Sequence, residues 1–303
     1  MLGSKYPLVI IIILNWNGKK LLKTCLSSLF RLTAYPNYKV IVVDNGSTDS
    51  SVEFVKKHFP KADILALDKN YGFAEGNNKG IKYVLKKYSP KYILLLSNDI
   101  KIVQKDWLGK LVRTAESNKK IGSVCPIEIS KKPLFKDKKI ISSTPWFSCC
   151  LIKSKVFFKI GLLDLVFYPA YYEDNDFAIR FKKSGFLSVH RTDCSIIHYA
   201  CQTSSKIDFD KIFFFRVKNK TIYLSRYSNL FKLIYSLSRS FLYIFINPKY
   251  LSPNKSFFRR FIYFFQGIKC GLIFHKYYCN KLDKDYEEIF RIMIKYCNSL
   301  LTT

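Results

Sequence analysis

The chain has 303 residues, enough for one large domain or for one domain with an appendage. Its 49% hydrophobic and 24% charged residues are ordinary for a folded globular protein. The 51 Lys and Arg against 22 Asp and Glu give a net charge of +29, which favours an anionic partner such as nucleic acid, an anionic membrane surface or a phosphorylated substrate. A lysine-rich, AT-biased genome would produce the same excess. The nine Cys form no C-x-x-C pair, which argues against a zinc ribbon, and their odd count and irregular spacing argue against a disulfide scaffold. Reduced thiols in a cytosolic setting are the simpler interpretation.

The first 125 residues alternate apolar runs with segments of helical spacing. We expect strands at 8–14, 39–43, 63–67 and 92–96, and helices near 19–31, 50–58, 76–88 and 106–117. Strands that are apolar throughout and separated by helices predict an α/β fold with a Rossmann-like, mainly parallel sheet flanked by helices. Ligands of such sheets bind beyond the carboxyl ends of the strands. No stretch reaches about 18 uncharged apolar residues, so we expect no ordinary transmembrane helix.

The rest of the chain changes character twice. We expect strands at 121–127, 146–152 and 186–190, a loop in the lysine-rich segment 128–141, and a helix from near Tyr172 to about Ser184 that stops at Gly185. Residues 212–280 then contain 12 Lys and Arg, 20 aromatic residues and no Asp or Glu.

Three polar stretches follow predicted strands. In VVDNGSTDSS (42–51), Asp44 could accept hydrogen bonds from a base or ribose, or could belong to a capped strand–helix loop. In NYGFAEGNNKG (70–80), the glycines would let the backbone approach a ligand, although a flexible loop leading into a helix explains them as well. In LLLSNDI (94–100), Asp99 could hold a divalent cation that keeps water and phosphate ligands, or could be a turn residue.

Further stretches follow in a fixed order: FSCCLIKSKVFFKIGLLD, YYEDNDFAIRFKKSGF and IIHY. Together with strand-NWNG and the three stretches above, they resemble the family 2 glycosyltransferases with the glycosyltransferase-A fold, closest to their rhamnosyltransferase-like branch. The resemblance covers about Leu8 to Ser205. It implies a glycosyltransferase that moves a hexosyl or deoxyhexosyl group from a nucleotide diphosphate sugar to an acceptor hydroxyl.

The resemblance also implies roles for individual residues. The donor and substrate would be bound by Asn15, Asp44, Asn70, Gly72, Phe73, Ala74, Asn77, Asn98 and Glu173. The family's Asp-x-Asp motif stands here as Ser97-Asn98-Asp99, which leaves Asp99 as the carboxylate ligand of a metal. His198 stands where many relatives have a His that binds this metal. The alternative interpretation is that His198 is a buried, hydrogen-bonded residue with no metal. Mg²⁺ or Mn²⁺ would suit such oxygen and imidazole ligands.

Three acids crowd together in YPAYYEDNDFAIRFKK (168–183), namely Glu173, Asp174 and Asp176. By the resemblance, Asp174 is the general base that takes the proton of the acceptor hydroxyl, and attack opposite the leaving diphosphate implies inversion at the anomeric carbon. From the residues alone, an acidic first helical turn explains the cluster. Asp176 and Arg180, at i and i+4, could simply pair.

We predict a catalytic glycosyltransferase-A domain at 1–205 and a helical basic and aromatic region at 206–303. The second region favours peripheral association with an anionic membrane surface at its cytoplasmic face, with a glycan or lipid-linked acceptor and no nucleic acid partner. Helices that merely pack on the catalytic domain would explain the same composition. Two other functions stay open: a sugar nucleotidyltransferase, and a non-catalytic protein that binds RNA or membrane.

Overall fold

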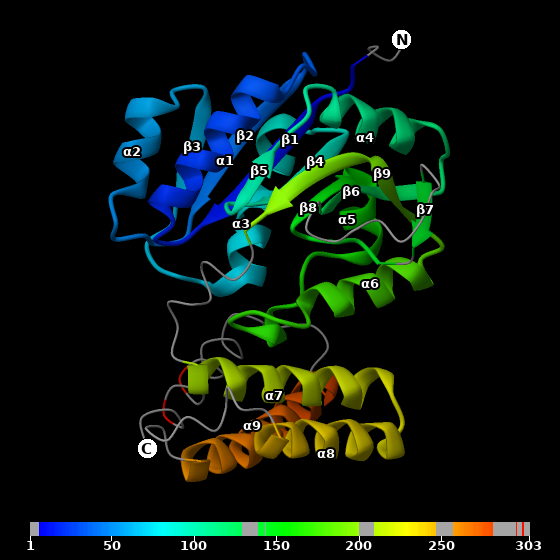
Figure 1. Cartoon of the computed structure of the whole chain (residues 1–303). Helices are drawn as coiled ribbons and strands as arrows, with labels where there is room; N and C mark the ends of the chain where they lie inside the picture. Colours follow the sequence, from blue (N-terminus) through cyan, green and yellow to red (C-terminus); the bar gives the residue numbers. More distant parts are fainter. Residues whose placement is uncertain are drawn as a thin grey trace. The chain divides into compact units, whose positions relative to one another are not determined.

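The computed structural model of the chain (Figure 1) describes residues 6–128, 139–142, 144–199, 209–246 and 257–280, together with the single positions 295 and 299. The chain divides into two compact units. The first comprises Met1–Asp164 and Asp174–Thr203, and the second comprises Leu165–Glu173 and Ser204–Thr303. The predicted boundary between 205 and 206 lies outside the described residues. The segment Leu165–Glu173, which the sequence analysis assigns to the catalytic domain, groups with the second unit.

The first unit is built on one mixed sheet. In the described residues, nine strands follow the order β3-β2-β1-β4-β8-β6-β9-β5, with β7 beside β9. The strands are β1 (Val9–Asn15), β2 (Tyr38–Asp44), β3 (Ala62–Ala66), β4 (Tyr92–Ser97), β5 (Ile100–Ile102), β6 (Ile121–Glu128), β7 (Lys139–Ser142), β8 (Cys149–Lys153) and β9 (Leu187–His198). β1 to β4 pair in parallel, as predicted, whereas β8 runs antiparallel to β4 and β6.

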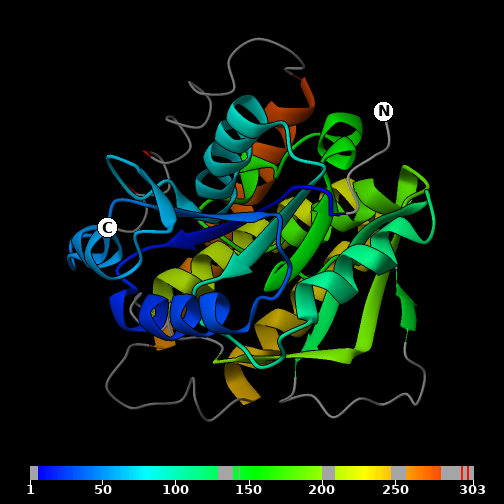
Figure 2. The same ribbon diagram turned by 90° about the horizontal axis from the view of Figure 1, so that it is seen from above.

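Helices cover both faces of this sheet. They are α1 (Lys19–Leu32), α2 (Ser51–His58), α3 (Gly72–Tyr88), α4 (Trp107–Glu116), α5 (Ser154–Ile160) and α6 (Glu173–Lys183). Figure 2 shows α1 and α4 below the sheet and α3 above it. In β1, Val9, Ile11 and Ile13 share a core with residues of α1 and α4, while Ile12 faces α3. The central strands are apolar throughout because both of their faces are covered.

The glycine-rich stretch 70–80 is mostly helix. α3 begins at Gly72, four residues before the expected start. A Cβ at Gly76 would lie 2.7 Å from Leu14 Cδ1, and one at Gly80 would lie 2.7 Å from Val43 Cγ2. These two glycines therefore let α3 lie close against the sheet.

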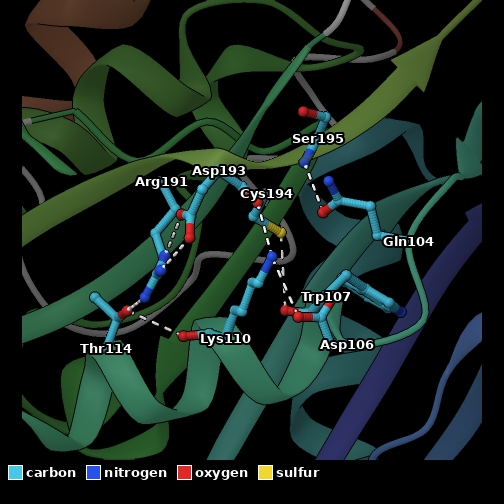
Figure 3. A network of polar contacts seen from close by, with 9 residues as sticks. All are labelled: Gln104, Asp106, Trp107, Lys110, Thr114, Arg191, Asp193, Cys194 and Ser195. Carbon is cyan, nitrogen blue, oxygen red and sulfur yellow. Dashed lines mark hydrogen bonds and ion pairs between the residues drawn. The ribbon is translucent and has the colours of Figure 1, made fainter. Parts of the chain in front are cut away.

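β9 extends eight residues beyond the strand expected at 186–190, and it changes register on the way. Arg191 pairs with Pro126, but the next pair joins Ser195 with Ile127. Figure 3 shows how α4 holds the intervening residues. Arg191 Nη1 donates to Thr114 Oγ1 at 2.7 Å, and Lys110 Nζ donates to the backbone oxygen of Asp193 at 3.0 Å. This irregularity (191–195) lets the second half of β9 pair with β5.

The segment 128–141 is not simply a loop. Glu128 ends β6 and residues 139–142 form β7, which pairs antiparallel with β9, so the prediction is wrong for Glu128 and for 139–141. Residues 129–138 lie outside the described part of the chain.

The second unit is helical, as predicted. It contains α7 (Phe209–Tyr227), α8 (Leu230–Ile246) and α9 (Phe257–Asn280). Many of its aromatic residues are internal, and one cluster contains Phe214, Tyr263 and Phe274. In the described ranges, no helix combines the length and the apolar character that crossing a bilayer requires.

Candidate active site

One hydrogen-bond network joins the carboxyl ends of β1, β2 and β4. Asn15 Nδ2 donates to Asp44 Oδ2 at 3.1 Å, and Asn98 Nδ2 donates to Asn15 Oδ1 at 2.9 Å. The N–H of Ser47 donates to the other oxygen, Asp44 Oδ1, at 2.9 Å. The structure thus brings three predicted residues together, all of them buried. Each oxygen of Asp44 accepts one of these hydrogen bonds, so this residue orders the edge of the sheet, and its role in binding the donor stays a prediction.

The turn before α3 is folded around two asparagines. Asn45 Nδ2 donates to Asn70 Oδ1 and to the oxygen of Gly72, each at 3.0 Å. The N–H of Gly72 donates to the same Asn70 Oδ1 at 2.8 Å, and Gly72 has a φ of +78°, which glycine adopts at little cost. Asn70 and Gly72 therefore shape this turn. Asn45 was missed by the sequence analysis, although its position directly after Asp44 at a strand end was a usable signal.

The remaining residues predicted for the donor lie in the first turns of α3. Phe73 is partly exposed, whereas Ala74 and Asn77 are buried. Asn77 Nδ2 donates to the backbone oxygen of Phe73 at 2.9 Å. Of these three, Phe73 alone has a partly exposed side chain, and the donor roles of all three stay predictions.

Pairing of β5 with β9 brings Asp99 and His198 together. His198 is the register partner of Ile100, and the N–H of Tyr199 donates to the oxygen of Asp99 at 3.0 Å. The side chains also meet, since His198 Nε2 lies 3.3 Å from Asp99 Oδ1. The two residues predicted as metal ligands are therefore neighbours, although 99 positions separate them in the sequence.

Glu128 contacts the other nitrogen of the same ring. His198 Nδ1 lies 3.1 Å from Glu128 Oε1, which also accepts a hydrogen bond from Ser148 Oγ at 3.1 Å. Hydrogen bonding to Asp99, together with the charges of Asp99 and Glu128, outweighs burial and raises the pKa of His198 above its ordinary value. Glu128 was not predicted as a site residue, because it falls at the start of the segment 128–141 that the sequence favours as a loop, and its contact with His198 is long-range.

The pair Asp99 and His198 fits a divalent cation by its chemistry. With Nδ1 turned to Glu128, Nε2 is the nitrogen on the side of the Asp99 carboxylate, an arrangement common in metal-binding histidines. An imidazole beside a carboxylate suits Mn²⁺ better than Mg²⁺, which prefers oxygen ligands. In the residues that the structure describes, no group of three or more His, Cys, Asp or Glu side chains is arranged to hold a metal. Water and phosphate oxygens would fill the other positions.

The three acids near the start of α6 have different surroundings. Asp176 is buried and pairs with Arg180 Nη2 at 2.8 Å, which confirms the i, i+4 pairing. Glu173 is buried as well. Asp174 is partly exposed, and its Oδ1 accepts the N–H and the Nδ2 of Asn175 at 2.8 and 2.9 Å. Among the described residues, Asp174 Oδ2 has no hydrogen-bond partner, so this oxygen is the one suited to accept a proton.

Packing ties α6 to the end of β4. Phe177, one turn after Asp174, lies with its ring centre 5.2 Å from that of Phe147. The next residue, Ser148, accepts the N–H of Ser97 on its backbone oxygen at 2.9 Å, and its hydroxyl contacts Glu128. α6 is thus anchored to the segment beside the Asp99–His198 pair. In the described structure, no hydrogen bond or ion pair joins Asp174 to that pair.

Solved structures define the fold. A mannosyltransferase, PcManGT from Pyrobaculum calidifontis, in complex with GDP-Man and Mn²⁺, matches with a TM-score of 0.58 and 13% identity over 99% of this chain and 87% of its own. GalNAc-T7 with UDP, GalNAc and Mn²⁺ matches with a TM-score of 0.56 and 14% identity over 73% of this chain and 50% of its own. The chain has the glycosyltransferase-A fold.

Sequence comparison gives the family. Residues 9–184 match glycosyl transferase family 2, and the chain belongs to this family. Every residue predicted for the site lies within the matched range except His198. Finer assignment to a rhamnosyltransferase-like branch stays a prediction.

Individual relatives are partial matches. The hexosyltransferase Agl10 of low-salt glycan biosynthesis in Haloferax volcanii is 25% identical over 211 residues, which cover 62% of this chain and 64% of Agl10. The O-antigen biosynthesis protein RfbC of Myxococcus xanthus is 30% identical over 112 residues, covering 36% of this chain and 8% of RfbC. An uncharacterized glycosyltransferase of Haemophilus influenzae is 31% identical over 132 residues, covering 42% and 39% of the two chains. The chain spans less than two-thirds of each of these relatives.

Proposed function

We propose that the protein is an inverting glycosyltransferase that moves a sugar from a nucleotide diphosphate sugar to an acceptor hydroxyl and uses Mn²⁺ or Mg²⁺. The observation that carries the proposal is the Asp99–His198 pair at the carboxyl end of β4, in a chain of glycosyl transferase family 2. The structures of PcManGT with GDP-Man and Mn²⁺ and of GalNAc-T7 with UDP, GalNAc and Mn²⁺ support the choice of donor and metal.

In the proposed reaction, the side chain of Asp174 does the proton chemistry. Its Oδ2 accepts the proton of the acceptor hydroxyl, while Asn175 keeps the other carboxylate oxygen in place. The acceptor oxygen forms a bond to the anomeric carbon as the bond from that carbon to the diphosphate oxygen breaks, and the diphosphate leaves with the electron pair. Attack from the face opposite the leaving group inverts the anomeric configuration.

Asp99 and His198 would hold the metal ion. When bound there, a divalent cation supplies positive charge that offsets the negative charge developing on the leaving diphosphate. Asn15, Asp44 and Asn98 keep the ends of β1, β2 and β4 in register beside it, so that the site is ordered before substrate binds.

Product analysis tests the proposal. The purified protein is incubated with Mn²⁺ and a panel of UDP-, GDP- and dTDP-sugars. We expect one of the donors to release its nucleoside diphosphate, and NMR of the first glycoside formed to show the anomer opposite to that of the donor. Pyrophosphate release from a nucleoside triphosphate and a sugar phosphate would instead identify a nucleotidyltransferase. Retention of configuration would refute the assignment of Asp174 as a lone base.

We also propose that the second unit docks on an anionic membrane surface through α8. The residues of one face of α8 recur at spacings of three and four, as in an amphipathic helix. The exposed apolar residues on this helix are Leu230, Phe231, Ile234, Tyr235 and Leu242, and Phe231 is 79% exposed. The opposite side of α8 packs inward, where Leu237 is buried in a cluster with Val217 of α7 and Phe264 of α9.

Charge and continuity favour a lipid surface as the occupant of this face. Lys232 and Arg239 are exposed on the same helix, and residues 212–280 contain no Asp or Glu. The apolar surface continues on α9, where the exposed ring of Phe265 lies 6.0 Å from that of Phe241 of α8. Aromatic and aliphatic side chains next to basic ones suit the headgroup layer of an anionic membrane. A stripe of exposed Leu, Ile and Phe does not complement the phosphates of RNA.

With this docking face we propose a location at the cytoplasmic side of the membrane and a glycan or lipid-linked acceptor. Five cysteines of the described part of the chain, Cys25, Cys125, Cys149, Cys150 and Cys194, are free and buried. Free thiols are typical of a reducing compartment, which supports the cytoplasmic side. A membrane-bound acceptor would explain why a catalytic unit carries a docking unit.

Vesicle co-sedimentation tests the docking face. We expect the protein to pellet with phosphatidylcholine vesicles that contain phosphatidylglycerol, to pellet less with phosphatidylcholine alone, and to be released by high salt. Phe231→Ser should weaken pelleting. Phe158→Ser is the matched control, because Phe158 on α5 of the first unit is exposed to a similar extent, 76%. A protein that stays in the supernatant with anionic vesicles at low salt refutes the membrane partner, and tighter binding of a labelled RNA would replace it.

A further inference from the structure

The segment Leu165–Glu173 leads directly into α6 but belongs to the compact unit of α7, α8 and α9. It contains a short 3-10 helix, Leu165–Phe167, and its last residue is the first residue of α6. The next residue in the chain is Asp174. Whatever holds this segment therefore sets where α6 begins.

Two neighbouring polar residues of α7, Lys218 and Asn219, hold the segment, and both are 0% exposed. Asn219 Nδ2 lies within hydrogen-bond distance of three backbone oxygens, those of Phe167 (2.7 Å), Ala170 (2.8 Å) and Tyr171 (3.0 Å). An amide nitrogen has two N–H groups, so one of them is shared between two acceptors. A single buried side chain thus fixes both ends of a five-residue stretch.

Lys218 binds two further carbonyl groups of the same segment, those of Val166 and Tyr168. Its Nζ donates to the oxygen of Tyr168 at 2.7 Å and to that of Val166 at 3.4 Å. The ammonium group also lies 5.8 Å from the ring centres of Phe215 and Phe274. A buried charge persists only where dipoles and rings offset the loss of water. The carbonyl groups of this segment provide that environment, which makes the contact specific.

The segment ends in two consecutive residues with left-handed backbone, Tyr171 (φ 79°) and Tyr172 (φ 74°). Bulky residues rarely adopt this conformation, and it persists where the surroundings enforce it. Here the surroundings are again α7. The Arg216 guanidinium lies 4.4 Å from the ring centre of Tyr171, and the Tyr223 ring lies 5.4 Å from that of Tyr172.

We propose that Lys218 and Asn219 are positioning residues for the base Asp174. They fix the backbone of 166–171, which the two left-handed residues Tyr171 and Tyr172 and then Glu173 join directly to Asp174. The inference rests on the proposed function, in which Asp174 takes a proton. Lys218 and Asn219 themselves are fully buried and touch no substrate. A misplacement of a reacting group by about 1 Å can lower a rate by about 10²-fold, so the orientation of this turn matters.

The same helix offers a matched control. Lys220 is partly buried and donates to Ser236 O at 3.0 Å and to Ser240 Oγ at 2.7 Å, both in α8. Lys220→Met therefore removes a lysine contact within α7–α9 and leaves the segment before α6 untouched. Lys218→Met and Asn219→Ala remove the contacts to the segment, and Lys218→Arg keeps a cationic donor.

Two readouts separate positioning from general damage. Turnover is followed as nucleoside diphosphate released, at saturating Mn²⁺, from whichever UDP-, GDP- or dTDP-sugar the wild type consumes. Donor binding is followed as the thermal shift caused by the same nucleoside diphosphate. We expect Lys218→Met and Asn219→Ala to lose kcat by about tenfold or more with unchanged donor binding. Lys220→Met should keep the wild-type kcat, and Lys218→Arg should recover part of the loss.

Full kcat in Lys218→Met and Asn219→Ala overturns the inference. So does a loss of donor binding parallel to the loss of kcat, or an equal loss of kcat in Lys220→Met, because either would indicate general damage. If Lys218→Met does not fold, Asn219→Ser and Lys218→Arg are judged by the same criteria. A wild type that neither binds a nucleoside diphosphate nor consumes a donor refutes the proposed function itself, and the panel shows this before any variant is compared.

Discussion

His198 Nδ1 lies 3.1 Å from Glu128 Oε1, so that the opposite ring nitrogen is the one that points at Asp99. A carboxylate in this place fixes the tautomer and the orientation of a metal-binding histidine. Glu128→Ala should therefore weaken Mn²⁺ binding by about 10–100-fold, as counted by the electron paramagnetic resonance of free Mn²⁺ in the presence of the nucleoside diphosphate. Glu128→Gln, which keeps an acceptor oxygen, should lose less. Unchanged Mn²⁺ affinity in Glu128→Ala would show that Glu128 does not orient His198 for metal binding.

Asp99→Ala should abolish the dependence of nucleoside diphosphate binding on metal. In the wild type, a diphosphate at 100 times its Kd stabilises the folded state by about 2.7 kcal/mol, and we expect this shift to require Mn²⁺. In the variant the shift should be small and the same with Mn²⁺ or with a chelator. Asp63→Ala is a suitable control, because Asp63 is an exposed residue of β3 that accepts a hydrogen bond from Tyr88. A full Mn²⁺-dependent shift in Asp99→Ala would contradict the proposed metal site.

Loss of the Asp174 carboxylate should lower activity, whereas loss of the Asp176 carboxylate should lower stability. Asp174→Asn removes a partly exposed carboxylate whose partner is Asn175, so we expect kcat to fall by roughly 10²–10⁴-fold with little change in the melting temperature. Asp176→Asn breaks a buried contact with Arg180 and should lower the free energy of unfolding by about 1–3 kcal/mol. Enzyme assays and urea denaturation of both variants check this. The assignment fails if Asp174→Asn keeps its activity.

The sequence predicts the first half of the fold well, because its strands are buried on both faces and read as unbroken apolar runs. It predicts the end of the sheet less well. β5 has only three residues, and β9 is interrupted by Arg191 and Asp193, whose side chains are held by each other and by α4. Polar residues inside a strand look like a loop until the helix that binds them is known.

The candidate site also contains residues that the sequence predicts and residues that it does not. Asp44 and Asp99 directly follow apolar runs, and strand ends that meet at one edge of a sheet make such residues predictable. Asn45 follows Asp44 directly and was predictable in the same way, whereas the role of Glu128 depends on His198, a side chain 70 positions away in the sequence. The contact between Glu128 and His198 is set by the parallel pairing of β6 with β9, whose register shifts between Pro126 and Ile127, and no local pattern in the sequence encodes this shift.

His190 should make the protein less stable as the pH falls. Burial lowers the pKa of His190 below its ordinary value, and this effect outweighs the hydrogen bond between Nε2 and the oxygen of Thr144 at 2.9 Å. Below a pH of about 6.5 the unfolded chain binds a proton on this residue that the folded chain does not bind. Stability therefore declines from about pH 6.5 down to the lowered folded pKa, by about 1.4 kcal/mol for each unit of depression.

His190→Gln tests this, because Gln can still donate to Thr144 and does not titrate. In urea denaturation with a chelator present, the wild type should lose stability relative to the variant as the pH drops below about 6.5. His198→Gln should show the opposite sign, because the pKa of His198 is raised in the folded state. Its contribution to stability is complete below about pH 6.5 and is lost as the pH rises through the folded value. A difference between wild type and His190→Gln that does not change with pH would mean that His190 has the same charge in the folded and unfolded chain.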